Sequence, residues 1–199
     1  MEFCLDTGVL DVPTLAAHCV WVSDNDMDIM KEKGVSVSHN PISNLKLGSG
    51  VMPLGKMLEK GIRVSLGTDG AASNNNLDVL SELRTAAILH KGVNLDPTVT
   101  RADQMIRLAT SEAALVQGRA DCGKIREGYR ADMILLDLNA LHNIPSYEYE
   151  TTVAYSARST DVLMTMVDGR ILYENGEYKT IDVEKLKYQA KELLAHYFD

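Results

Sequence analysis

Three polar side chains that could carry chemistry each follow a short apolar run of the sequence: His18, His39 and Asp69. They lie about 20 and about 30 residues apart, which fits one strand, loop and helix in each interval. In a barrel of parallel strands, the carboxyl ends of the strands converge on one mouth. Two imidazoles and a carboxylate gathered there are ligands suited to zinc, iron or manganese. The spacing therefore predicts a shared site.

Each of the three residues also has an ordinary structural interpretation. His18 could be a hydrogen-bonded core histidine, and His39 could shape the turn at Asn40. Asp69 could cap the turn that follows it. The segment 67–76, rich in Gly, Ser and Asn, favours a site at Asp69, because small residues let the backbone approach a ligand closely. The remaining histidines have no such setting and are interpreted as surface or packing residues: His90, His142 and His196.

The elements that must position these residues alternate along the first part of the chain. Short apolar runs predict strands near 15–17, 35–38 and 62–66. Helical spacing and glycine stops predict helices over 24–33, 50–60 and 77–91, with Gly92 ending the third, and a pair of helices over 101–117 whose second member starts at Ser111. Strands that alternate with helices in this way favour a parallel sheet with helical crossovers.

The pattern changes after Gly118. Segment 131–137 is predicted to be a strand, and 162–173 a hairpin whose turn is Asp168-Gly169. Asn175-Gly176 marks a second turn, and 183–198 has the apolar spacing of an amphipathic helix.

Composition narrows the class of protein. The chain has 199 residues, 45% of them hydrophobic and 24% charged, which is typical of a globular protein. A net charge of −8 argues against partners such as nucleic acid or an anionic membrane. No apolar run approaches the roughly 20 residues of a membrane span, and the start of the chain does not resemble a signal peptide. Three cysteines without metal spacing favour a reducing, cytoplasmic location.

Three long strings of residues resemble a known family. They are Ala17-His-Cys-Val-Trp21, Ser38-His-Asn-Pro-Ile-Ser-Asn-Leu-Lys-Leu-Gly-Ser-Gly50 and Leu66-Gly-Thr-Asp-Gly-Ala-Ala-Ser-Asn-Asn75. They resemble the amidohydrolase superfamily, and within it the S-adenosylhomocysteine/5′-methylthioadenosine deaminases. The resemblance extends from about Leu15 to about Tyr178, and the segments 123–136 and 167–172 are similar to the small β-sandwich of that family.

The resemblance implies a fold and its boundaries. Residues 1–120 would be the last three βα units of a (β/α)8 TIM-type barrel, an α/β fold. Residues 121–180 would be part of the β-sandwich, and residues 181–199 a C-terminal helix. The implied activity is hydrolytic deamination of an adenosine-type nucleoside to the inosine analogue and ammonia.

The resemblance also implies roles for single residues. Asp69 matches the aspartate that ligates the metal, Zn2+ or else Fe2+ or Mn2+, and that shuttles a proton. His18 matches the histidine that hydrogen-bonds the attacking hydroxide. Residues expected to bind the substrate are His39, Asn40, Ser43, Asn44 and Asp69. Residues expected to brace the metal aspartate are Ser73, Asn74 and Asn75.

The sequence departs from the family pattern in what it lacks. Neither a His-x-His pair nor a His-x-x-Glu motif occurs in the 199 residues, so only Asp69 of the expected metal ligands is present. A catalytic zinc site takes three or more protein ligands. We therefore expect the chain to be inactive alone, and the resemblance leaves open that no metal binds to it. Either it is a fragment, which we favour, or a half-barrel that forms a homo-oligomer or pairs with the missing N-terminal half.

Two other functions stay open. A chlorohydrolase or a guanine-type aminohydrolase would share the same strings, although the segments 73–78 and 82–84 with Lys91 favour the nucleoside branch. A non-catalytic assembly module is the third possibility, and the metal content of the chain would discriminate it from an enzyme.

Overall fold

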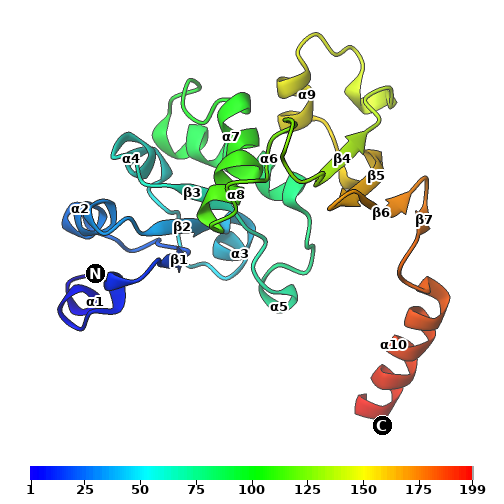
Figure 1. Ribbon diagram of the computed structural model, residues 1–199, viewed down its shortest axis with the longest axis horizontal. Helices are drawn as coiled ribbons and strands as arrows, with labels where there is room; N and C mark the ends of the chain where they lie inside the picture. Colours follow the sequence, from blue (N-terminus) through cyan, green and yellow to red (C-terminus); the bar gives the residue numbers. More distant parts are fainter. Residues whose placement is uncertain (199) are drawn as a thin grey trace.

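A small parallel sheet lies at the centre of the molecule in the computed structural model, which describes residues 1–198 (Figure 1). Its strands are β1 (Leu15–Ala17), β2 (Ser36–His39) and β3 (Val64–Leu66), in the order β1-β2-β3. Both pairings are parallel, with Ala16 opposite Val37 and Ser38 opposite Ser65. The predicted parallel sheet is therefore confirmed.

Helices surround this sheet and form the crossovers between its strands (Figure 1). In chain order they are α1 (Glu2–Asp6), η1 (Val9–Asp11), α2 (Asp24–Glu32), α3 (Pro41–Lys46), α4 (Leu54–Glu59), α5 (Ala71–Asn74), α6 (Val79–Asn94), α7 (Ala102–Ala109) and α8 (Ser111–Val116). Helix α2 begins at a capping box, in which Ser23 and Asp26 bond each other's backbone N–H groups. The predicted alternation of strands and helices is thus present.

Three helix boundaries differ from the prediction. Helix α6 continues through Gly92 to Asn94, because the left-handed residue that ends it is Leu95. Helix α4 starts only after Pro53, since Gly48, Gly50 and Pro53 leave the preceding segment irregular. Helix α3 lies in a segment for which the sequence pattern predicts no helix, and it forms with Pro41 in its first turn, where a missing N–H costs nothing.

The hydrophobic core lies between the parallel sheet and its helices. Met27 and Met30 of α2, Met57 of α4 and Leu83 of α6 are almost completely buried in it. Strand β3 is buried along its whole length and is therefore covered on both faces, as is typical of strands in parallel sheets, whereas β1 has two exposed residues.

A second sheet is antiparallel and follows the helical region. Its strands are β4 (Met133–Leu136), β5 (Val162–Val167), β6 (Arg170–Glu174) and β7 (Glu177–Tyr178), in that order. The turn between β5 and β6 is the predicted Asp168-Gly169 pair, and both residues have positive φ, 51° and 77°. This is the requirement of a primed hairpin turn, so the predicted hairpin is confirmed.

Segment 121–180 is not self-contained. It includes η2 (Leu141–Asn143), η3 (Ser159–Asp161) and an unexpected helix, α9 (Tyr149–Tyr155), which packs against α6 and α7. Ala154 of α9 is part of the main core, and Arg84 donates a hydrogen bond to the carbonyl oxygen of Ala157 at 2.8 Å.

The final helix, α10 (Val183–Phe198), extends away from the rest of the molecule (Figure 1). Its apolar side chains Leu186, Leu193 and Leu194 are exposed. Within residues 1–198, no helix is both long enough and apolar enough to span a membrane.

Candidate functional site

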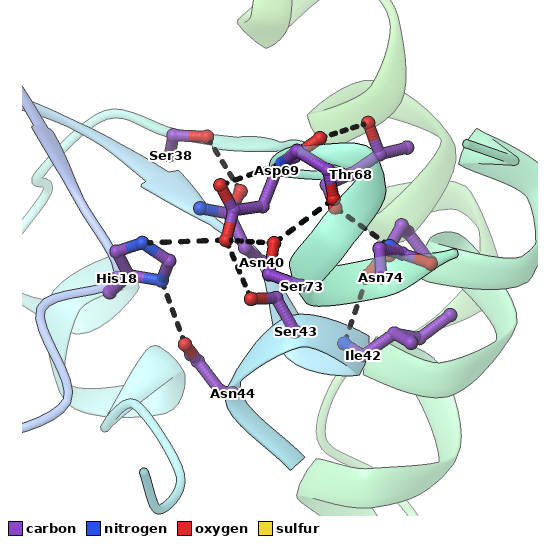
Figure 2. A network of polar contacts seen from close by, with 12 residues as sticks. His18, Ser38, Asn40, Ile42, Ser43, Asn44, Thr68, Asp69, Ser73 and Asn74 are labelled. Atoms are coloured by element: carbon purple, nitrogen blue, oxygen red, sulfur yellow. Dashed lines mark hydrogen bonds and ion pairs between the residues drawn. The ribbon is translucent and has the colours of Figure 1, made fainter. Parts of the chain in front are cut away.

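Polar side chains gather beyond the carboxyl ends of the parallel strands (Figure 2). His18 follows β1 directly, and Asp69 lies three residues after the end of β3. Helix α3, which follows β2, supplies Ser43 and Asn44 to the same place. The parallel pairing thus brings residues from three separate strand ends to one edge of the sheet, as the spacing predicts.

Asp69 is at the centre of this group. Its Oδ2 accepts hydrogen bonds from the hydroxyl groups of Ser43 at 2.6 Å and of Ser73 at 2.7 Å. Its Oδ1 accepts one from the backbone N–H of Gly70 at 2.8 Å. These three hydrogen bonds lower the pKa of the Asp69 carboxyl to about 2, with a smaller contribution from His18. Asp69 is therefore ionised throughout the neutral range, and Oδ1 retains a free lone pair.

His18 faces Asp69 from across the group. Its Nε2 lies 3.8 Å from Asp69 Oδ2, and its Nδ1 is bonded to Asn44 Oδ1 at 2.8 Å (Figure 2). An Nδ1–H that donates to the amide oxygen of Asn44 fixes the orientation of the ring, with Nε2 directed toward Asp69. The side chains of His18 and Asp69 are 41% and 31% exposed, so both remain accessible from solvent.

The backbone at both residues has an uncommon conformation. His18, Cys19 and Asp69 all have φ between 46° and 65°, in the left-handed region. For residues other than glycine such conformations are held by the surrounding structure and concentrate at functional sites. The Cys19 side chain packs against the core, and burial raises the pKa of its thiol to about 11, so the structure supports a packing role for it.

Asn40 packs beside the loop that leads from β3 to Asp69. It is buried, and its Oδ1 accepts a hydrogen bond from Ser38 Oγ at 2.9 Å. A Cβ at Gly67 would lie 2.5 Å from both of these oxygens, so only glycine fits at this point of the loop that leads to Asp69.

The structure does not bring His39 into the group around Asp69, and this corrects the expectation that it does. His39 is the last residue of β2, so its side chain alternates to the opposite face from Ser38 and Asn40. It is fully buried, and its Nε2 is 2.9 Å from Nε2 of His90 on α6. His90 is therefore a packing residue with a specific partner.

The three residues expected to brace Asp69 take different positions. Ser73 bonds the carboxylate directly. Asn74 donates instead to the carbonyl oxygen of Thr68, at 2.7 Å, and to the carboxylate of Glu82. Asn75 faces away and accepts a hydrogen bond from Lys46.

Glu82 is the supporting residue whose place the sequence interpretation missed. It is completely buried on α6, although glutamate is almost never buried without partners. A signal was present in the sequence, because Glu82 is adjacent to Leu83 and four residues before Ala86, on the apolar face of the helix.

The metal-binding capacity of this part of the protein is limited. Within residues 1–198, no three His, Cys, Asp or Glu side chains are grouped so that they could hold a metal ion. Asp69 nevertheless fits a ligand role, since its carboxylate is ionised, exposed and oriented by two hydroxyl groups.

A parallel α/β sheet with polar side chains at its carboxyl edge is the arrangement in which α/β enzymes place their active sites. The chain belongs to the Amidohydrolase family, which it matches over residues 1–172. Among curated proteins it is 50% identical, over 193 residues, to a 5-methylthioadenosine/S-adenosylhomocysteine deaminase of Acetivibrio thermocellus. It is 46% identical to a 5'-deoxyadenosine deaminase of Methanosarcina mazei. Each alignment covers 96% of this chain but 45% of the relative, so the chain spans less than half the length of these relatives.

Solved structures of the family have the same fold. A zinc-bound adenosine deaminase from Xanthomonas campestris superposes with a TM-score of 0.88 at 35% identity, covering 92% of this chain and 42% of that protein. A zinc complex of an atrazine chlorohydrolase from Arthrobacter aurescens superposes with a TM-score of 0.84 at 27% identity, covering 90% and 40%.

Proposed function

We propose that this chain is the C-terminal part of a metal-dependent deaminase of adenosine-type nucleosides. Its substrate would be S-adenosylhomocysteine, 5′-methylthioadenosine or adenosine, and its products the inosine analogue and ammonia. The observation that carries this proposal is the ionised Asp69 carboxylate, fixed by Ser43 and Ser73 and faced by His18 at 3.8 Å. The deaminase relatives at 46–50% identity support the choice of substrate.

The proposal includes the place of the chain in the whole fold. Strands β1, β2 and β3 would be the last three strands of a (β/α)8 barrel, within a unit of residues 1–120. Residues 121–180 would contribute to a small β-sandwich, and 181–199 would be a closing helix. Support comes from the parallel order β1-β2-β3 and from the separate antiparallel sheet β4–β7.

A divalent metal, zinc by analogy with the zinc-bound relatives, would bind at Asp69 together with ligands from outside this chain. When bound, such a metal lowers the pKa of a coordinated water toward 7 and so supplies hydroxide at neutral pH. Asp69 fits this role, because its Oδ1 has a free lone pair. The fit is partial, because a single carboxylate falls short of the three protein ligands that zinc needs.

The residues of this chain would divide the chemistry between them. Asp69, ionised at neutral pH, accepts a proton from the attacking water and holds it near the leaving amino group. His18 Nε2 accepts a hydrogen bond from that water and orients it toward the purine carbon that bears the amino group. Asn44 fixes the His18 ring, because its Oδ1 holds the proton on Nδ1. Ser43 and Ser73 keep the carboxylate in one orientation.

A chlorohydrolase is the second candidate, because a chlorohydrolase structure shares the fold with a TM-score of 0.84. It is the weaker candidate, since the identity is 27% there against 50% for the deaminase relative.

The proposed partner of the chain is the remainder of the barrel. Strands β1 and β3 each pair on one side only among the described residues, so both edges of the parallel sheet have unpaired backbone groups beside the site. Strands added there would close the sheet and bring the missing ligands to Asp69.

The decisive experiment joins this chain to the N-terminal part of the Acetivibrio thermocellus relative, in place of the segment that the chain matches. The fusion, loaded with zinc, is expected to release ammonia from S-adenosylhomocysteine or 5′-methylthioadenosine, whereas the chain alone releases none. Hydrolysis of atrazine but of neither nucleoside would favour the chlorohydrolase. A folded, zinc-loaded fusion that acts on none of these compounds would refute the proposal.

A further inference from the structure

Glu82 connects two helices that are far apart in the chain. It lies on α6 with no exposed surface, and its two carboxylate oxygens have different partners. Oε2 accepts a hydrogen bond from the backbone N–H of Ile42 on α3 at 3.1 Å, and Oε1 accepts one from the side-chain amide of Asn74 on α5. Both partners are therefore donors.

Each partner of Glu82 is the sequence neighbour of a serine that holds Asp69. Ser43 follows Ile42, and Ser73 precedes Asn74 (Figure 2). These serines donate to the same oxygen of Asp69, at 2.6 Å and 2.7 Å. The position of the Asp69 carboxylate thus depends on the separation between α3 and α5, and Glu82 spans that separation.

Asn74 adds a second link from Glu82 to the site. Its side-chain amide also donates to the carbonyl oxygen of Thr68 at 2.7 Å, and Thr68 immediately precedes Asp69. The backbone that enters the left-handed conformation at Asp69 is therefore tied to the same network.

We propose that Glu82 is a positioning residue of the deaminase site, whose buried carboxylate holds α3 and α5 at the separation that lets Ser43 and Ser73 orient Asp69. This inference rests on the proposed function for its role in catalysis, whereas the mechanical coupling from Glu82 to Asp69 does not. A buried carboxylate is costly unless its oxygens are paired, and here both oxygens are.

The chemistry of the two contacts requires a carboxylate. A glutamine has the same shape but a single acceptor oxygen, so its NH2 group would face either the Ile42 N–H or the Asn74 amide. Glu82→Gln should therefore loosen one of the two helices without leaving a cavity. A matched control is Asp161→Asn, because Asp161 is also a buried carboxylate and its partners, His142, Asn143 and Arg158, lie on neither α3 nor α5.

The first test measures the coupling in the full chain by nitrogen-15 NMR, with no metal or substrate. Glu82→Gln is expected to shift the amide resonance of Gly70, which reports the contact with Asp69 Oδ1, and those of Ser43 and Ser73. Asp161→Asn is expected to leave all three unchanged. A shift at Ile42 with none at Gly70 would overturn the proposal. If Glu82→Gln does not fold, Glu82→Asp keeps the charge but shortens the reach of the carboxylate, and it should shift the same three resonances.

The second test uses the fusion with the Acetivibrio thermocellus segment. There Glu82→Gln should lower kcat by about 10²-fold while KM changes little, because misplacement of a catalytic group by about 1 Å has an effect of this size. Asp161→Asn should leave kcat within about threefold, and loss of kcat in both variants alike would reduce Glu82 to a general structural role. If the unaltered fusion is inactive, the proposed function fails while the NMR result still decides the coupling.

Discussion

The two sheets of this chain differ in how completely they are covered. Strand β3 of the parallel sheet is buried along its length, and β2 is buried at three of its four residues. Strands β4, β5 and β6 of the antiparallel sheet have no buried residue, and Ile134 and Leu135 of β4 are half exposed. Strands β2 and β3 of the parallel region thus have their covering layers within the chain, whereas Leu15 and Ala17 of β1 are exposed, and the antiparallel sheet has apolar side chains without a covering layer among residues 1–198.

The group around Asp69 lies in the same region of the chain as the buried hydrophobic core. Every residue of the buried hydrophobic core except Ala154 lies at or before Leu108, and the group around Asp69 is built on the same elements. The stability of the site should therefore depend on the first region and little on the second. Four experiments test this difference.

The largest expected effect is on activity. In the fusion with the relative, Asp69→Asn should lower kcat/KM by about 10²–10⁴-fold, the usual contribution of a group that transfers protons. The matched control is Asp168→Asn in the β5–β6 turn, where asparagine also tolerates the positive φ. This control should retain full activity, and an equal loss in both variants would contradict the assignment of the site.

The next effect is on the stability of the two regions. Met57 is completely buried, so Met57→Ala should reduce the free energy of unfolding by about 2–5 kcal/mol. Leu135 is 53% exposed, so Leu135→Ala should change it by less than about 0.5 kcal/mol. Urea unfolding of the two variants measures both values. Similar losses would mean that the antiparallel sheet is as well packed as the parallel one.

A smaller change in the free energy of unfolding is expected at Gly67, in the loop that leads to Asp69. Gly67→Ala should cost about 1–3 kcal/mol, because its Cβ would lie 2.5 Å from Ser38 Oγ and Asn40 Oδ1. Gly92→Ala, in the open last part of α6, should instead stabilise the chain by about 0.5–1 kcal/mol. Thermal unfolding of the two variants distinguishes them by the sign of the change, and a neutral Gly67→Ala would contradict the tight fit.

The last prediction concerns the dependence of stability on pH. Burial lowers the pKa of both His39 and His90, with an added contribution from their proximity at His39. Below about pH 6.5 the unfolded chain binds protons that the folded chain excludes. The free energy of unfolding should therefore be highest above this pH and fall as the pH decreases, by up to about 1.4 kcal/mol per pH unit for each histidine.

Unfolding midpoints at about pH 7 and pH 5 measure this dependence. His90→Gln should reduce the slope by roughly half, because one of the two buried histidines is removed. His196→Gln in the exposed helix α10 should leave the slope unchanged. If both substitutions have the same effect, the buried pair is not the origin of the acid sensitivity.

Local patterns in the sequence were sufficient for most of the elements, though not for helices α3 and α9, and for part of the site. The Asp168-Gly169 hairpin follows from the turn preference of two residues, and the parallel sheet follows from alternating strands and helices. The proximity of His18 and Asp69 follows from one rule, that parallel strands end at the same edge. Whether these two residues act in catalysis stays a prediction.

Other features depend on contacts that a local pattern does not contain. His39 is the last residue of its strand, and its side chain is therefore on the helix side, next to His90. The burial of Glu82 depends on two helices that precede it in the chain. Helix α6 passes Gly92 and ends at Leu95, since a single glycine in an exposed helix costs only about 1 kcal/mol relative to alanine.

The left-handed backbone at His18 and Asp69 has a consequence for evolution and engineering of this protein. Glycine adopts these angles without a penalty, while any other residue there stores about 1–3 kcal/mol that the rest of the fold must offset. A library selected only for thermal tolerance should therefore drift toward glycine at both positions and lose the reactive groups. Selection for stability and selection for turnover would act in opposite directions on the same two codons.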